Sequence, residues 1–168
     1  MKKILALAFL STLLMSFSCK EKDAEDEDLI HVEFGFGDSS VPPQYHRSYT
    51  LDIEEETTTL LIDSYGDTLL FEEFNSNGRL KKVQEIVRSS NMKGCKETDD
   101  DGCTGGTSVA LTAETATGAV VDGYAYKCAG SYTGTICGDI DDLKSRIRDL
   151  FPEIASGLDK VEDWEPGN

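Results

Sequence analysis

The chain has 168 residues, of which 32 are acidic and 16 are basic, so its formal net charge is −16. This length provides a core for one domain and is too short for two domains of ordinary size. The negative charge argues against a nucleic-acid-binding protein, because such proteins attract phosphates with Lys and Arg. A hydrophobic fraction of 39% is too high for a chain that is disordered throughout.

The first 19 residues have the layout of a secretory signal. Two lysines precede an apolar run over residues 4–15, which is too short and wrongly flanked for a stable membrane span. Residues 16–19 resemble a bacterial lipobox, with Phe17 in place of the usual small residue. The resemblance implies that residues 1–18 are a lipoprotein signal peptide and that Cys19 is lipidated, its acyl chains holding the protein to a membrane. The alternative is an ordinary cleaved signal peptide.

An acidic segment follows the cysteine. Residues 20–28 hold six acids, two lysines and one alanine, so together with Cys19 we expect them to form a solvated tether over residues 19–28. Removal of the signal leaves 14 basic residues against 32 acidic ones, a net charge of −18. The position of the acids resembles the export signal of Bacteroidota surface lipoproteins. It implies an outer-membrane lipoprotein of the bacterial cell envelope, facing either the cell surface or the periplasm.

The four remaining cysteines predict two disulfides, because an even count in an exported chain is typical of a disulfide framework. Three pairings are open, and we favour the two local ones because each encloses a polar, glycine-containing loop. A zinc site is the alternative, but the C-x₂-C spacing of structural zinc motifs is missing. The favoured pairs are Cys95 with Cys103 and Cys128 with Cys137.

Alternation of apolar and polar residues predicts strands over most of the chain from residue 29 onward. The expected strands lie at residues 29–36, 45–54, 57–63, 68–74, 107–114 and 119–128. The first four are expected to form an antiparallel meander.

Two segments change to a helical period. Apolar residues at helical spacing predict one helix that is capped by Asn75 or Ser76 and ends near Asn91. A second is capped by Asp139 and ends at Pro152, and the tail holds a short docked helix at most. This order predicts an α+β fold: one antiparallel sheet of about five or six strands with two main helices on one face, as a single domain over residues 29–168.

No residues form a convincing catalytic set. His31 and His46 are expected at exposed strand positions, with a metal pair as the alternative. Residues 90–93 match the S-x-x-K motif, but its partner motifs S-D-N and K-T-G are missing.

A weak calcium site is one alternative reading of the acidic loop at residues 97–102. Glu97, Asp99 and Asp101 space their oxygens as the first half of an EF-hand loop does, but Ser108 stands where that loop needs its final Glu. A solvated acidic loop without any cofactor is the simpler interpretation.

Five tyrosines suggest an aromatic surface for a sugar or peptide, although half-buried strand tyrosines are more common. They are Tyr45, Tyr49, Tyr124, Tyr126 and Tyr132. Residues 41–50 resemble openings of uncharacterised bacterial exported proteins, which implies no activity. We therefore expect a non-enzymatic binding or structural module of the cell envelope, anchored by its lipid and binding a protein or small ligand. The alternatives are an inhibitor or immunity lipoprotein, and an exported hydrolase that uses His31 or His46.

Overall fold

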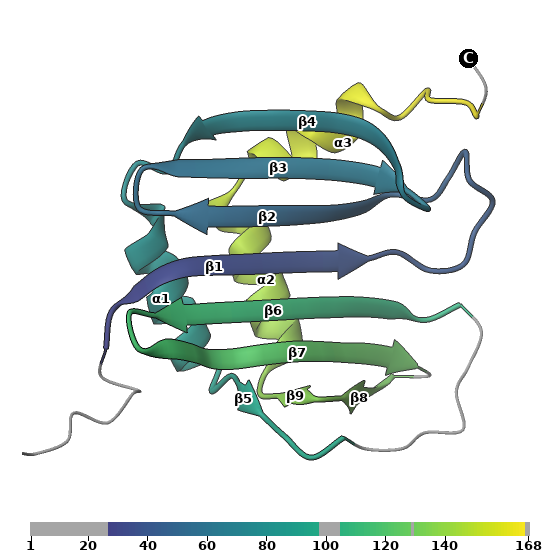
Figure 1. The fold of residues 1–168 in the computed structure, drawn as a ribbon. Helices are drawn as coiled ribbons and strands as arrows, with labels where there is room; N and C mark the ends of the chain where they lie inside the picture. Colours follow the sequence, from purple (N-terminus) through teal and green to yellow (C-terminus); the bar gives the residue numbers. More distant parts are fainter. Residues whose placement is uncertain (1–26, 98–104, 129, 167–168) are drawn as a thin grey trace, which may run out of the picture.

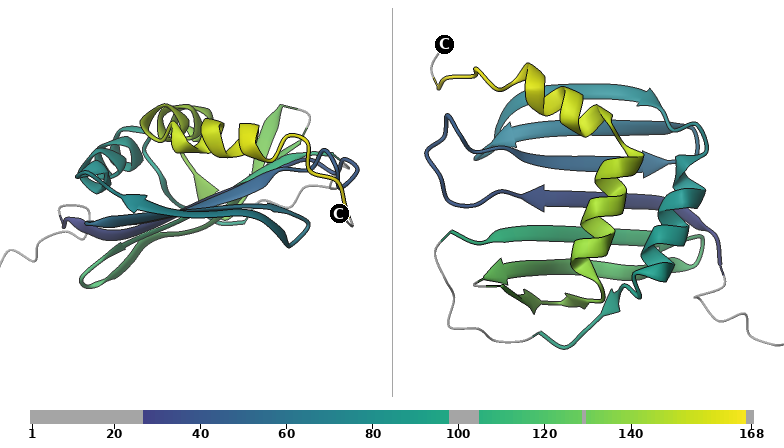
Figure 2. Two further views of the ribbon diagram at one scale, coloured as in Figure 1. Left: turned by 90° about the horizontal axis from the view of Figure 1, so that it is seen from above. Right: turned by 180° about the vertical axis from the view of Figure 1, so that it is seen from behind.

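A seven-stranded antiparallel sheet carries three helices on one face in the computed structural model, which describes residues 27–97, 105–128 and 130–166 (Figure 1, Figure 2). This confirms the predicted α+β class and antiparallel sheet. The sheet strands are β1 (Leu29–Gly37), β2 (Ser48–Glu54), β3 (Thr57–Ser64), β4 (Asp67–Asn75), β6 (Thr107–Thr115), β7 (Gly118–Cys128) and β8 (Ser131–Gly134). Two short strands, β5 (Lys93–Gly94) and β9 (Ile136–Cys137), pair separately.

The strand order is β4-β3-β2-β1-β6-β7-β8, with β1 in the middle. Strands β1 to β4 follow one another toward one edge of the sheet. The chain then crosses the sheet through α1 (Arg79–Ser89), and β6 to β8 lie on the other side of β1. The five or six predicted strands do not include β8. Its four residues, with Gly134 at the end, are too few to show the alternation on which strand prediction depends.

The core lies between the sheet and the helix layer of α1, α2 (Ile140–Leu150) and α3 (Glu153–Lys160) (Figure 2, right). Apolar strand residues point toward apolar helix residues, so burial of these side chains is the main stabilising contribution. Fully buried members include Val32, Phe34, Leu51, Ile53, Leu60, Ile62 and Leu111 in the sheet, and Leu80, Val83, Leu143, Ile147 and Ile154 in the helices.

The beginning of α1 differs from the prediction. Ser76 is buried and its hydroxyl bonds Thr58 at 2.7 Å, so its side chain does not cap the helix. Gly78 occupies the N-cap position with φ of 69°. This left-handed conformation is one that glycine adopts without steric cost. The predicted caps Asn75 and Ser76 are therefore wrong, whereas Asp139 does cap α2 by accepting the Asp142 amide at 3.0 Å.

A third helix, α3, follows directly after Pro152. The same proline that ends α2 occupies the N-cap of α3 with φ of −61°, a value suited to a helix start. The helix approaches the sheet closely at the buried Gly157, where a Cβ would lie 2.8 Å from Ile62 and Leu70. The prediction allowed a short docked helix in the tail besides the two main ones, and the observed helix has eight residues and begins at Glu153.

Arg79 joins the start of α1 to the start of α3. Its guanidinium donates to both carboxylate oxygens of Glu153 at 2.8–3.0 Å and lies 4.6 Å from the centre of the Phe151 ring. Burial raises the pKa of Glu153, but the hydrogen bonds and charge of Arg79, together with a backbone hydrogen bond, outweigh it, and the net pKa is below its ordinary value. Arg79 also donates to the carbonyl oxygen of Leu150 in α2 at 3.4 Å, so this mostly buried pair contacts all three helices.

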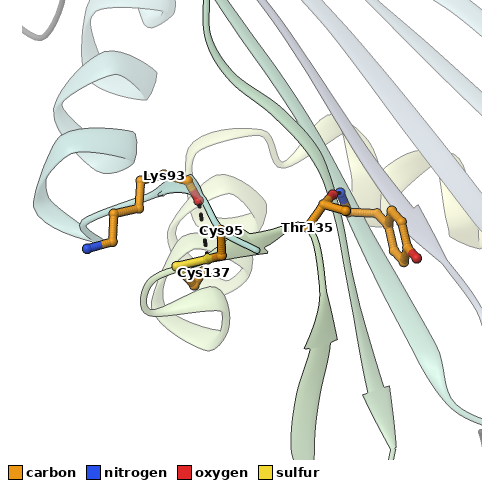
Figure 3. Close-up of a disulfide and its surroundings, with 5 residues drawn as sticks. Lys93, Cys95, Thr135 and Cys137 are labelled. Atoms are coloured by element: carbon orange, nitrogen blue, oxygen red, sulfur yellow. Dashed lines mark hydrogen bonds between the residues drawn. A yellow bond between two sulfur atoms is a disulfide. The ribbon is translucent and has the colours of Figure 1, made fainter. Parts of the chain in front are cut away.

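The disulfide between Cys95 and Cys137 connects β5 with β9 (Figure 3). The predicted pairs Cys95–Cys103 and Cys128–Cys137 are therefore wrong. The β5–β9 ladder, in which Lys93 lies opposite Cys137, brings the two cysteines together, and such a pairing cannot be read from loop composition. The bridge spans 42 residues along the chain, and a loop of that size stabilises by about 4 kcal/mol in the chain-entropy model. Cys103 lies outside the described residues.

None of the helices in the described part of the chain is long and apolar enough to cross a membrane. The predicted signal, Cys19 and nearly all of the acidic tether lie outside the described residues, so lipid anchoring stays a prediction.

Candidate functional site

One face of the sheet carries no helix. Figure 1 looks directly onto this open face, and Figure 2 shows the helix layer on the opposite side. Alternation along each strand puts buried residues toward the helices and the intervening residues on the open face, as for Val32 and Glu33 in β1. The open face is therefore left uncovered by the helices.

Apart from His31, the charged side chains on the open face are acidic. Strands β1 to β4 and β6 contain no Lys or Arg. The one lysine of β7, Lys127, turns to the helix layer, where its Nζ lies 2.7 Å from Asp141 and lowers the pKa of that carboxyl to about 2. Alternation and register place seven acids on the open face: Glu33, Asp52, Glu54, Asp63, Glu73, Glu114 and Asp122.

The basic residues gather on the helix layer instead. They are Arg79, Lys81, Lys82 and Arg88 in α1, Lys144, Arg146 and Arg148 in α2, and Lys160 in α3. The same helices also carry six acids, so the helix layer is close to neutral and the strongly negative surface is the open face.

One line of residues across the strands, here called the acidic row, concentrates this charge. The register aligns Glu73, Thr59, Asp52, Glu33, Thr112 and Asp122 from β4 to β7. Glu33 and Asp52 face each other directly on neighbouring strands. Like charges in that position destabilise a sheet, so this arrangement costs the fold stability.

The next line across the strands, here called the small-residue row, runs beside the acidic row. It consists of Phe71, Leu61, Thr50, Gly35, Ala110 and Tyr124. The side chains are small in the middle of this row and large at its ends, where Phe71 is 64% and Tyr124 43% exposed. Exposed aromatic side chains are enriched at binding surfaces.

His31 is the one basic group that the described strands place on this face, and it lies between two acids. Its Nε2 lies 2.9 Å from Asp52 and its Nδ1 lies 3.1 Å from Glu114. Partial burial lowers the pKa of His31, but the hydrogen bonds with Glu114 and Asp52 outweigh it, and the net pKa is above the ordinary value. Both nitrogens donate to carboxylates only when the ring is protonated.

This geometry argues against catalysis by His31. In a catalytic triad one imidazole nitrogen faces the nucleophile, whereas both nitrogens of His31 face carboxylates.

His46 is buried rather than exposed, contrary to the prediction. It lies in the loop before β2 and stacks on Tyr65 at 3.9 Å. Its Nε2 lies 3.4 Å from the Ser48 hydroxyl, but its buried Nδ1 has no partner among the described residues. Without an orienting carboxylate this pair is not a triad. His31 lies opposite Glu54 at the far end of β2, roughly 20 Å away by strand rise, so the two histidines form no metal pair.

No group of three or more metal-ligating side chains occurs in the described ranges. Of the predicted calcium ligands, Glu97 accepts the Tyr124 hydroxyl at 3.0 Å, and this bond raises the pKa of Tyr124. Asp99 and Asp101 lie outside the described residues, so the calcium site stays a prediction.

The five tyrosines do not form one surface. Tyr124 and Tyr126 lie on the open face, Tyr49 is buried in the core, and Tyr132 bonds Asp141 of the helix layer. The open face was not predicted, although Arg47 is the only Lys or Arg residue in the first four predicted strands.

A groove of about 500 Å³ lies beside α1. It contains neither a histidine nor a serine, and its charged side chains are Glu27, Arg88 and Lys93. Its lining is Glu27, Leu29, Gln84, Val87, Arg88, Asn91, Met92, Lys93, Val120 and Val121.

Comparison of the chain with protein-family models, with curated protein sequences and with solved structures finds no match.

Proposed function

We propose that this chain is an exported lipoprotein of the bacterial cell envelope whose domain is a non-enzymatic binding module. The open face of the sheet is its binding surface. The observation that carries the proposal is the division of charge, with seven acids on the open face and the basic residues on the helix layer. Neither solubility nor packing requires such a division.

Two features support the choice of surface. The direct pairing of Glu33 with Asp52 is unfavourable for folding, and proteins keep such arrangements mainly where function needs them. The exposed Phe71 and Tyr124 also supply apolar contact area at opposite ends of the small-residue row.

The membrane attachment rests on Cys19 and on the acidic segment after it. Acyl chains at Cys19 would hold the protein to the outer membrane. An acidic face is repelled by anionic lipid, so the sheet is expected to point away from the membrane.

Photo-crosslinking in intact cells tests the binding surface. A photoreactive amino acid is placed at Ala110 on the open face or at the exposed Ser145 on α2. We expect a discrete crosslinked product from Ala110 and none from Ser145. Products from Ser145 alone, or from neither position, would contradict the proposed surface.

A further inference from the structure

The open face also indicates the chemistry of its partner. We infer that it binds a segment of another protein that presents Lys or Arg beside a line of apolar side chains. This inference rests on the proposed function and adds the class of partner to it.

The first argument is charge complementarity. The acidic row places Glu73, Asp52, Glu33 and Asp122 in one line, with threonines between them. Adjacent strands lie about 4.8 Å apart, so neighbouring acids of this row are about 5 or 10 Å apart. A line of carboxylates at this spacing matches lysines and arginines on one face of a partner segment.

The second argument is the apolar line beside the charges. The small-residue row leaves room over Gly35 and Ala110 for side chains of the partner, and Leu61 and Tyr124 border that room. A free cation or polyamine would gain nothing from the apolar side chains of this row. A protein segment with apolar residues next to basic ones fits both rows at once.

The third argument is size. Six strands span about 24 Å, and seven residues of strand cover about 24 Å in the other direction, giving a face of roughly 600 Å². This approaches the roughly 800 Å² that each partner contributes to a standard protein interface. The face is therefore large enough for a specific protein contact.

Other occupants fit less well. A second copy of the chain would bring the same acids against each other, because a symmetric dimer pairs one face with itself. Anionic lipid and nucleic acid are repelled by the same charges. Protonated His31, which Asp52 and Glu114 hold, offsets one of the seven acids and leaves the face negative.

The test is a binding titration of the full lipidated protein in non-ionic detergent. The probe is a short, fluorescently labelled peptide of alternating Lys and Val, and the matched probe carries Glu in place of Lys. We expect the Lys peptide to bind and to be released by salt, while the Glu peptide does not bind. Absence of binding by the Lys peptide would overturn the inference.

Two variants with the same charge change locate the site. Asp122→Lys reverses a charge of the acidic row, and Asp149→Lys does so on an exposed position of α2. Like-charge repulsion at an interface predicts a loss of affinity of about tenfold or more for Asp122→Lys. We expect Asp149→Lys to leave the affinity nearly unchanged.

Equal losses of affinity in both variants would mean that binding depends only on the net charge of the protein, and would overturn the inference. Thermal unfolding of each variant shows whether the fold is retained. The crosslinking experiment separates the two proposals, because it does not depend on charge. A product from Ala110 with a partner that lacks a basic surface would refute this inference and leave the binding function standing.

Discussion

His31 of β1 and Glu114 of β6 are 83 residues apart in the chain, yet the imidazole Nδ1 lies 3.1 Å from the carboxylate. With Asp52 on the other side of the ring, the histidine bridges three neighbouring strands at the centre of the sheet. Protonation of this ring therefore joins the two halves of the sheet and makes the charge of the open face less negative by one unit.

Stability is expected to depend on the protonation of His31. Its pKa is raised by folding, so its stabilising contribution is complete below the unfolded pKa of about 6.5 and is lost as the pH rises through the raised value. Thermal unfolding measured across this pH range should show the decline in the wild type and a flatter profile for His31→Gln. Identical profiles would contradict the bridging role.

Glu33→Thr is predicted to stabilise the fold and to weaken binding. Thr59 and Thr112 already occupy the same row, so threonine fits there, and it removes the repulsion between Glu33 and Asp52. Chemical denaturation should show a gain of up to about 1 kcal/mol. A loss of stability would mean that Glu33 serves the fold and not a partner.

Arg79→Ala is predicted to cost about 3 kcal/mol, because it leaves the carboxylate of Glu153 largely buried without its partner. Chemical denaturation measures this loss. Lys81→Ala on the exposed face of the same helix is the control and should change stability by less than about 0.5 kcal/mol. Equal effects of the two substitutions would refute the stabilising role of the Arg79–Glu153 pair between α1 and α3.

Tyr49→Phe should leave stability unchanged or raise it by about 1 kcal/mol. The hydroxyl of Tyr49 is buried with no hydrogen-bond partner among the described residues, and burial raises its pKa to about 12. The ring itself stacks on Phe36 at 5.3 Å, a contact that phenylalanine keeps. A clear loss on thermal unfolding would show that the hydroxyl has a partner after all.

Disulfide mapping of the unreduced protein is expected to recover a peptide that joins Cys95 to Cys137. With that pair formed, Cys103 and Cys128 are left for the second bridge that the even cysteine count predicts. A peptide that joins Cys95 to Cys103 would contradict the β5–β9 pairing.

The sequence predicted much of the fold, because alternation reveals which residues of a strand are buried. Six strands and two main helices, with one of the two caps, follow from local patterns of this kind. The pairing of Cys95 with Cys137 and the acidic row do not, because they depend on which strands are neighbours. Glu33 and Asp122 lie 89 residues apart in the sequence and belong to one row only through the register of β1, β6 and β7.

The most direct test of the central claim is to locate the bound Lys–Val peptide by backbone amide chemical shifts of the isotope-labelled protein. We expect the largest changes on the central strands of the open face, at Gly35, Thr50 and Ala110. Changes confined to α1 and α2, around Lys82 and Ser145, would contradict it.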